Sequence, residues 1–443
     1  MDESVSVGVL SLHTSKETKA IVNTVNELGH DGTWLRDDNL VVDVEDNRVT
    51  IEPNVDVIVN RLLLSNTEQP SELLGLAKSL SRLRPMLNRP ENVLTAFHKF
   101  ATATAMAETS VRIPDAFLSL DADRLNEKRQ SFGDEVVYKT AIGTHGGGTW
   151  KITEGETVNP RVGDRFAFLQ ELIEQNEDQR HSDLRVYIVD GDIVGAMNRY
   201  APENDWRTNV ALGGDVEGVE SVPDAAADMA REAADILGLD YAGVDLVEGV
   251  DGWYLLEVNP TAGFKGLYRA TGVSPAAHIA KLAIETGGGT VDEADVERMA
   301  SVLDDSTPPD AAPPAAAHDG ERKVIGYIED VLVSGTSGTE RVRSKSDTGA
   351  SRTSVDTRLA AKIGAGPIKS MTKVKSGSHK GGKSRPVVDI VVGIGGDRHT
   401  VQASLEDRSH MEYPLLLGRD ILRDYQVDVR HRSDGVESNS EEE

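Results

Sequence analysis

Cysteine is absent from all 443 residues of the chain. Without thiols there is no disulfide bond, no thiolate nucleophile and no cysteine-based zinc site. Aromatic residues make up only 5% of the sequence, and no apolar run approaches the length that spans a bilayer. The first residues lack the cationic region of a signal peptide and run directly into a strand-like segment. We therefore expect a cytoplasmic protein with no membrane partner.

Positive charge is also scarce, since 74 aspartates and glutamates outnumber 47 lysines and arginines to give a formal net charge of −27. This excess argues against general binding to nucleic acid or to anionic membranes. It keeps the surface hydrated, and salt screens the self-repulsion that it causes. The composition is therefore interpreted as an adaptation to high intracellular salt.

The stretch over residues 241–266, YAGVDLVEGVDGWYLLEVNPTAGFKG, organises the rest of the chain. Two apolar strand-like runs are separated by glycine and aspartate, which predicts a β-hairpin. Glu257 and Asn259 are two residues apart and so leave the same face of a strand, and antiparallel pairing can bring Asp245 to that face. Three oxygen donors of this kind suit Mg²⁺. The alternative from these residues alone is an edge hairpin with solvated carboxylates.

The N-terminal region predicts a small parallel-sheet domain that extends to about residue 90. Alternating valines form a first strand, a helical pattern follows over residues 15–28, and an apolar run covers residues 55–64. This is a β-α-β pattern. No G-x-G-x-x-G follows the first strand, which argues against a redox dinucleotide site in this domain.

Two later segments carry lysines that are candidates for binding phosphate. Residues 88–117 predict a helix followed by a strand, with Lys99 inside the helix, where a solvated lysine is the plain alternative. Residues 136–152 predict a strand that ends near Lys139, and a cluster of glycines follows: Gly143, Gly146, Gly147 and Gly148. Glycines let backbone N–H groups approach phosphate oxygens closely. No G-K-[ST] follows, so this is not a Walker loop, and a flexible hairpin turn is the alternative.

Three further segments carry polar side chains that are candidates for binding a ligand. Residues 166–175 form an apolar strand running into acidic residues, residues 183–200 a hairpin with a tight turn, and residues 205–217 a loop. The polar side chains that they contribute are Glu171, Asp183, Arg185, Arg199, Arg207 and Asn209.

A proline- and alanine-rich linker over residues 303–322 separates a second globular piece from the first. Residues 322–432 contain 20 lysines and arginines against 13 aspartates and glutamates, a surplus of 7 positive charges in an acidic protein. One acid-free stretch over residues 368–388 carries Lys369, Lys373, Lys375, Lys380, Lys383 and Arg385. It is either a binding site for an anionic partner or a solvated loop.

The order of these segments resembles that of the ATP-grasp ligases, specifically the RimK-like branch, over residues 1 to about 290. The motifs are RPENVLTAFHKF, VVYKTAIGTHGGGTW, FLQELI, DLRVYIV, DWRTNVALGG, GVDLVE and LLEVNPTAGFKG. The resemblance implies an ATP-dependent ligase that joins an amino acid, commonly glutamate, to the carboxylate of a protein C-terminus or small carrier through an acyl phosphate. With the acidic composition it suggests a haloarchaeal source.

The resemblance also implies roles for individual residues. Nucleotide contacts fall to Lys99, Lys139, Gly146, Gly147, Glu171, Asp183, Arg207 and Asn209, with Glu171 at the adenine and Asp183, Arg207 and Asn209 at the phosphates and ribose. Asp245, Glu257 and Asn259 would be the ligands of Mg²⁺ or Mn²⁺. Arg185 or Arg199 would hold an acceptor carboxylate, and Arg207 would add positive charge during phosphoryl transfer.

The C-terminal piece holds SDTGASRTS (346–354) and YPLLLGRDIL (413–422), which together resemble the retropepsin-like domains that accompany RimK-like ligases. An aspartic protease site needs two carboxylates, and this piece supplies only Asp347, so an active site requires a homodimer. Lys345 and Ser346 weaken the usual apolar lead-in. The histidines lack zinc-ligand spacing, so we expect no metal here.

These inferences predict an α/β plus all-β protein: an ATP-grasp fold with an N-terminal parallel-sheet (pre-ATP-grasp) domain, linked to a C-terminal retropepsin-like β-barrel. The expected boundaries are 1–90 (pre-ATP-grasp), 91–290 (ATP-grasp), 291–322 (helix end and linker), 323–432 (retropepsin-like) and 433–443 (disordered acidic tail). Two other functions stay open: a nucleotide-sensing binding module whose inactive protease domain docks a partner, and a peptidase regulated by its ATP-grasp half.

Overall fold

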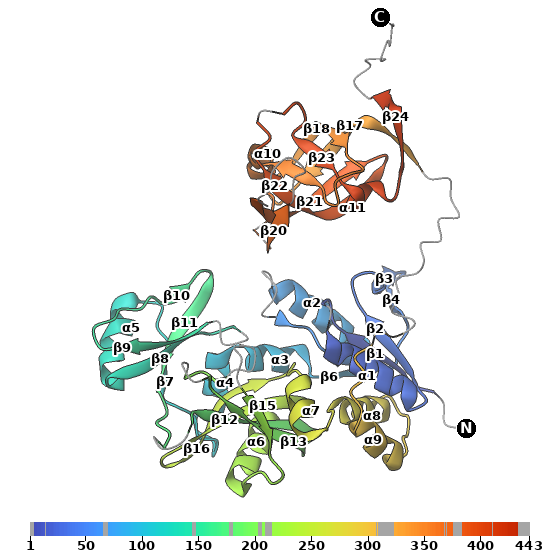
Figure 1. The fold of residues 1–443 in the computed structure, drawn as a ribbon. Helices are drawn as coiled ribbons and strands as arrows, with labels where there is room; N and C mark the ends of the chain where they lie inside the picture. The colour runs from blue at the N-terminus through green and yellow to red at the C-terminus, as the bar shows by residue number, and fades with distance from the viewer. Residues whose placement is uncertain are drawn as a thin grey trace, which may run out of the picture. The chain divides into compact units, whose positions relative to one another are not determined.

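The computed structural model divides the chain into two compact units, residues 1–313 and 314–443, each of which is described by itself (Figure 1). The residues that it describes are 4–13, 15–64, 70–143, 148–176, 180–202, 206–208, 215–306, 308, 323–366, 368, 370–374, 383–409 and 411–432.

The first unit begins with a four-stranded parallel sheet in the order β2-β1-β5-β6. Its strands are β1 (Ser6–Leu10), β2 (Asp31–Leu35), β5 (Val57–Asn60) and β6 (Met86–Leu87). Helix α1 (Lys16–Glu27) begins where Ser15 caps it and ends before Gly29, whose φ of +84° stops the helix. Helices α2 (Pro70–Leu80), α8 (Ala276–Thr286) and α9 (Glu293–Ala300) complete this region, where α1 and α8 share one apolar core.

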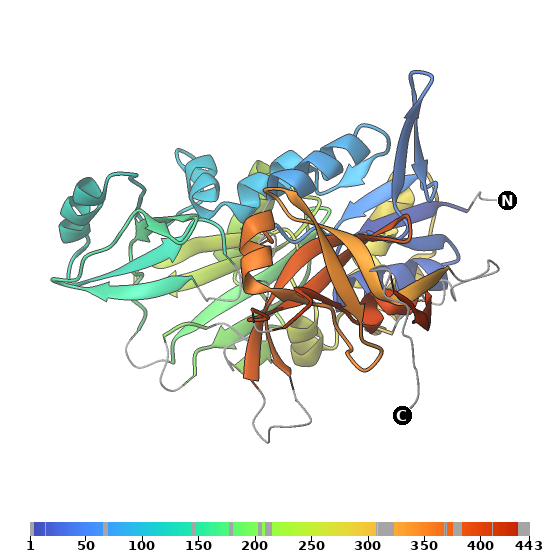
Figure 2. The same ribbon diagram turned by 90° about the horizontal axis from the view of Figure 1, so that it is seen from above.

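The sequence did not predict β2 or the two-stranded ribbon of β3 (Val41–Glu45) and β4 (Arg48–Glu52). The ribbon turns at Asp46 and Asn47, both with positive φ, as a two-residue hairpin turn requires. It extends away from the parallel sheet (Figure 2), and nine of its ten strand residues are exposed. Its strands do alternate, as VVDVE and RVTIE around an Asp-Asn turn, so a local hairpin signal was present in the sequence and was missed.

The helix predicted around Lys99 is interrupted at His98. Helix α3 (Pro90–Phe97) ends there and α4 (Lys99–Met106) begins, because His98 adopts an extended backbone and its Nδ1 accepts a hydrogen bond from the Ala101 N–H at 3.1 Å. Lys99 therefore lies in the first turn of a helix. Its backbone N–H, which no carbonyl of α3 accepts, donates to the Ala141 carbonyl at 2.8 Å.

A five-stranded antiparallel sheet forms the next layer, with the path β10-β11-β8-β9 and β7 paired to β11. Its elements are β7 (Ala116–Phe117), α5 (Ala122–Arg129), β8 (Glu135–Thr140), β9 (Thr149–Thr153), β10 (Arg161–Val162) and β11 (Arg165–Gln170). Its small apolar core is separate from the two larger cores of this unit.

The third sheet is antiparallel in the order β14-β13-β12-β15-β16. Its strands are β12 (Ser182–Val189), β13 (Asp192–Tyr200), β14 (Asp215–Gly218), β15 (Tyr241–Gly249) and β16 (Gly252–Asn259), and helices α6 (Asp224–Ile236) and α7 (Lys265–Thr271) pack on it. Strand alternation divides its two faces. Even-numbered side chains such as Val186 and Val244 pack in one core with the alanines of α6. Odd-numbered side chains, among them Asp183 and Asp245, therefore lie on the other face.

The second unit is a closed β-barrel. Strands β21 (Lys383–Ile394), β22 (Asp397–Glu406), β19 (Ser354–Asp356), β23 (Leu415–Leu417), β18 (Thr339–Ser346) and β17 (Val324–Ser334) pair in this order, and β17 pairs with β21 to close the ring of six. Strands β20 (Ser370–Val374) and β24 (Gln426–Arg432) extend the sheet, and helices α10 (Thr357–Ile363) and α11 (Arg419–Leu422) complete the unit. This architecture agrees with the predicted retropepsin-like barrel.

Within the described residues, no helix combines the length and apolar character that crossing a membrane requires.

Candidate functional site

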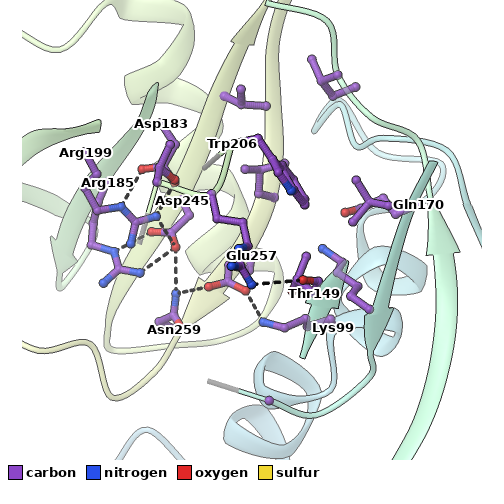
Figure 3. Close-up of a pocket in the computed structure, with 18 of the residues that line it drawn as sticks. Lys99, Thr149, Gln170, Asp183, Arg185, Arg199, Trp206, Asp245, Glu257 and Asn259 are labelled. Atoms are coloured by element: carbon purple, nitrogen blue, oxygen red, sulfur yellow. Dashed lines mark hydrogen bonds and ion pairs between the residues drawn. The ribbon is translucent and has the colours of Figure 1, made fainter. Parts of the chain in front are cut away.

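A cavity of about 1530 Å³ in the first unit collects most of the predicted site residues. Its walls come from the second and third sheets, the start of α4, and the loops that follow β1, β5 and β16. Figure 3 shows charged side chains entering it from strands that are far apart in sequence.

The floor of the cavity is a network of cross-strand ion pairs on the odd-numbered face of the third sheet. Arg199 lies opposite Asp183 on the neighbouring strand and binds it through two N–O contacts of 2.5 and 2.6 Å. Arg185 lies opposite Asp245 and binds it through two contacts of 2.6 Å. A contact of 2.9 Å between Arg199 and Asp245 joins the two pairs. Register alone therefore brings four charges together with their signs balanced.

The predicted metal ligands converge on the adjoining strand pair. Asp245 and Glu257 are register partners of β15 and β16, and the Asn259 Nδ2 lies 3.2 Å from a carboxylate oxygen of each. Lys99 forms an ion pair with Glu257 (Figure 3). Burial alone would raise the pKa of Glu257, but the ammonium groups of Lys99 and Lys139 outweigh it and hold that pKa well below its ordinary value. Glu257 is therefore ionised at neutral pH.

Lys139 enters the cavity from β8 and is 6% exposed. Its ammonium lies 5.5 Å from the centre of the Phe168 ring, and within the described part of the chain it has no carboxylate partner in ion-pair range. Burial, and then repulsion by Lys99, lowers the pKa of Lys139 to about 7. A buried cation that titrates near neutrality and faces a cavity is a candidate phosphate ligand.

The remaining predicted nucleotide residues divide into three groups. Arg207 lines the cavity and donates to the Thr149 carbonyl at 3.5 Å, and its neighbour Thr208 donates to Asp183. Glu171 follows β11 at the cavity wall, where its carboxylate accepts the Asp115 N–H at 3.1 Å. Gly146, Gly147 and Asn209 lie outside the described residues.

The two arginines predicted to hold an acceptor carboxylate are already engaged. Each guanidinium of Arg185 and Arg199 directs its two-pronged edge at a carboxylate of the protein itself. In this structure they therefore orient Asp183 and Asp245, and a substrate carboxylate could reach only their remaining N–H groups.

Several cavity residues were not anticipated from sequence. Gln170, Thr149 and Trp206 line the side formed by the second sheet and the loop after β13 (Figure 3). His13, Glu17 and Arg61 line the side formed by the parallel-sheet domain. Arg61 could have been identified from the sequence, because a lone arginine interrupts the apolar run VDVIVNRLLL. Glu17 could not have been identified in this way, since it resembles any other acidic residue in the first turn of a helix.

The donor set fits a hard divalent cation. Two carboxylates and one amide converge, and an amide can offer its oxygen as well as its nitrogen. The described residues contain no cluster of three or more histidine, aspartate or glutamate side chains suited to a metal, and here the third donor is an amide. Asp245, Glu257 and Asn259 thus offer the oxygen-rich environment that Mg²⁺ and Mn²⁺ prefer.

The second candidate site is the turn after β18. The Asp347 N–H donates to the Leu417 carbonyl at 2.9 Å, so β23 runs beneath the turn, and the Asp347 carboxylate accepts the N–H groups of Gly349 at 2.9 Å and Ala350 at 3.3 Å. The basic stretch expected to grip an anionic partner is only partly described. Of its six cations, Arg385 alone has a described side chain, and it is paired with Glu406.

Comparison with known proteins identifies the class. The structure is similar to that of the ATP-grasp ligase PsnB solved with a minimal precursor, with a TM-score of 0.51 and 17% identity over 64% of this chain and 100% of that one. The complex of PsnB with its minimal precursor, Mg and ADP gives a TM-score of 0.51 and 16% identity over 63% and 97% of the two chains. At this identity the likeness establishes the fold, which is that of an ATP-grasp ligase, as predicted.

Sequence similarity then gives the family. Residues 96–283 match the RimK-like ATP-grasp domain, and residues 360–434 match the retropepsin-like aspartic endopeptidase RimB, a match that leaves out Asp347. The tetrahydromethanopterin:alpha-L-glutamate ligase of Methanocaldococcus jannaschii is 30% identical over 205 residues, covering 44% of this chain and 69% of the relative. A protein of Shewanella amazonensis named "Probable alpha-L-glutamate ligase 2" is 28% identical over 61% and 92% of the two chains.

This chain belongs to the RimK-like ATP-grasp family and is a ligase that forms carbon–nitrogen bonds. Membership implies the use of ATP and a divalent metal ion.

Proposed function

We propose that this protein uses ATP and Mg²⁺, or Mn²⁺, to join an amino acid, with glutamate as the first candidate, to the carboxylate of a protein C-terminus or small carrier. The observation that carries the proposal is the convergence of Lys99, Lys139, Asp245, Glu257 and Asn259 in one cavity from four separate elements. The naming of relatives as alpha-L-glutamate ligases supports glutamate.

In the proposed reaction a carboxylate oxygen of the acceptor attacks the γ-phosphorus of ATP, the bond to the β-phosphate oxygen breaks, and ADP leaves. The nitrogen of the amino acid then attacks the resulting acyl phosphate, inorganic phosphate leaves with the bonding electrons, and the nitrogen gives up its proton. The protein does little covalent work, so positioning and charge neutralisation dominate. The bound cation would neutralise charge on the phosphates.

The side chains of this protein have separate tasks in that scheme. Lys139 and Arg207 supply positive charge to the phosphate end of the cavity. Asp245, Glu257 and Asn259 would hold the cation, and the ion pairs of Arg185 and Arg199 keep the Asp245 carboxylate in its orientation. Lys99 neutralises Glu257 in this structure and would be free to turn to phosphate when a cation takes its place.

The most direct test is mass spectrometry of a cell extract incubated with the protein, Mg-ATP and each amino acid in turn. The expected result is a product whose mass grows by one or more residues of one amino acid, with ADP formed in step. ADP release that is independent of every amino acid would instead favour a nucleotide-sensing module.

We further propose that the barrel binds or trims the ligated product. The supporting observation is the position of Asp347 on a tight turn over β23. Because one barrel supplies one such carboxylate, cleavage would require two copies of the chain to share a proton between their Asp347 side chains.

Asp347→Asn is expected to remove any cleavage of glutamate-extended peptides. ADP formation should be unchanged, because Asp347 lies in the second unit and the proposed ATP cavity lies in the first. Peptide cleavage by the full chain, measured as a function of protein concentration, should rise more steeply than linearly. Asp330→Asn, which replaces an exposed carboxylate on β17, is the matched control. Cleavage that persists in Asp347→Asn would exclude the dyad.

The interpretation as a high-salt protein gives another prediction. With a formal net charge of −27, self-repulsion grows as screening weakens, so the free energy of unfolding should fall when salt is lowered from molar to tenth-molar concentration. Urea unfolding at a series of KCl concentrations measures it. A free energy that does not fall would dismiss the adaptation.

A further inference from the structure

The wall of the cavity formed by the parallel-sheet domain carries two opposite charges that the proposed chemistry has not used. Arg61 follows β5 and is 3% exposed. It has no carboxylate partner among the described residues, and its Nε is buried without any hydrogen-bond partner. Its other nitrogens donate to the carbonyls of Thr261 and Ala262 over long distances of 3.4 Å, and its guanidinium lies 5.2 Å from the centre of the Phe264 ring. A buried guanidinium this poorly satisfied is costly unless an anion joins it.

Glu17 is the opposite charge. It lies in the first turn of α1, lines the same cavity and has no cationic partner among the described residues. Its two oxygens accept the Ser15 hydroxyl at 3.1 Å and the Phe264 N–H at 3.3 Å, which leaves lone pairs on both oxygens for a further donor.

Arg61 and Glu17 hold the same short loop. Arg61 contacts the carbonyl of Ala262 and Glu17 the N–H of Phe264, two residues further on, so the two anchor points are within about 7 Å along the chain. His13 lines the same wall, and its pKa is lowered by burial and by the Arg61 charge, which the Glu17 charge opposes. The loop begins directly after Asn259, so this wall adjoins the proposed cation site.

The geometry points to an amino-acid subsite in which Arg61 binds the α-carboxylate and Glu17 binds the ammonium of the incoming substrate. An α-amino acid carries both charged groups on its α-carbon, so the two side chains that bind it must lie close together, as two that contact the same short loop do. The inference rests on the proposed function and adds to it the residues that recognise the amine donor.

Equilibrium binding of L-glutamate to the full chain, in the presence of Mg²⁺ and a non-hydrolysable ATP analogue, tests the subsite without knowledge of the acceptor. Replacing Arg61 removes a charge-assisted contact, so Arg61→Gln is expected to weaken L-glutamate binding by roughly 10- to 100-fold. Glu17→Gln keeps an acceptor for the Phe264 N–H while losing the charge, and should weaken binding by about tenfold.

Arg129→Gln is the matched control. Arg129 is equally buried, at 4% exposure, and its Nε also lacks a partner, but it lies outside the cavity and donates at 2.8 and 2.7 Å to the carbonyls of Gly133 and Asp134. It should change L-glutamate binding less than twofold. Equal losses in Arg129→Gln and Arg61→Gln would overturn the subsite. Should Arg61→Gln not fold, Glu17→Gln decides alone, and unchanged binding there overturns it.

Two analogues identify the carboxylate that is bound. L-glutamine keeps the α-carboxylate and L-isoglutamine lacks it, so the wild-type protein should bind only the former and Arg61→Gln should lose the distinction. A wild-type preference for L-isoglutamine would overturn the assignment. The proposed function is judged separately, because an amino acid added in the mass-spectrometric experiment supports the ligase whether or not Arg61 and Glu17 affect binding.

Discussion

Glu257→Gln is expected to lower amino-acid-dependent ATP turnover by about a thousandfold or more, because an uncharged amide cannot replace an ionised ligand of the cation that neutralises the phosphates. The substitution keeps the size of the side chain and removes the partner of Lys99, which is only partly buried and can turn to solvent. The fold should therefore survive. ADP formation with a saturating amino acid is the measurement.

Asp245→Ala should abolish turnover as well, but for two reasons at once. Asp245 is 1% exposed and takes charged contacts from both Arg185 and Arg199, so its loss leaves two buried guanidinium groups short of an anion. Breaking such a pair destabilises a protein by about 3–5 kcal/mol. The loss of turnover must therefore be read beside the free energy of unfolding, which Glu257→Gln should leave nearly unchanged.

Asp192→Asn is the control for both variants, since it replaces an exposed carboxylate of the same sheet that does not line the cavity. Turnover close to wild type in Glu257→Gln would remove the cation site from these strands. It would leave the carbon–nitrogen ligase assignment to the family relationship alone.

The affinity for nucleotide is expected to fall as pH rises through neutrality, because Lys139 has a pKa of about 7 in the free protein. Phosphate placed beside it favours the protonated form and raises that pKa, so above pH 7 binding must take up a proton. The dissociation constant of a non-hydrolysable ATP analogue should then rise by up to about tenfold per pH unit. Below pH 7 the lysine is already charged and the dependence should flatten.

Lys139→Arg provides the comparison, because arginine stays protonated throughout this range. The pH slope should be absent in that variant, and ionisation of the nucleotide itself is common to both proteins. Lys139→Met should bind about 10- to 100-fold more weakly than wild type at pH 6, with a smaller deficit at pH 9. Equal slopes in the wild-type and arginine proteins would exclude Lys139 as the titrating group.

Much of the fold was predictable because its signals are local. The hairpin of β15 and β16 and that of β12 and β13 follow from apolar runs with glycine and aspartate between them. Strand alternation places Glu257 and Asn259 on one face, so they could be proposed as metal ligands from spacing alone, whereas Asp245 is opposite Glu257 only because the register shifts between Asp245 and Leu246. The ring closure of the barrel, in contrast, depends on pairing β17 with β21 across more than 40 residues, which no local pattern specifies.

The candidate site was less predictable than the fold, because its contacts depend on which strands become neighbours. That Arg185 binds Asp245 and Arg199 binds Asp183 requires the strand order β13-β12-β15, which residue spacing does not give. The wall that includes Glu17 comes from a domain whose residue Glu17 is 247 residues away in sequence from the Phe264 N–H that it accepts. The break at His98 is likewise invisible in an apolar pattern, since Phe97 and Phe100 keep helical spacing across it.

That break gives Lys99 two attachments. Its backbone N–H reaches Ala141, at the end of β8 and the start of the glycine-rich segment, while its side chain reaches Glu257 on β16. An uninterrupted helix would have used that N–H internally. One residue therefore contacts both the start of the glycine-rich segment and Glu257, the residues proposed for phosphate and for the cation. Binding of nucleotide and binding of the cation would then be coupled through the position of Lys99. A substitution that made the helix continuous at position 98 would remove the contact with Ala141 and with it this coupling.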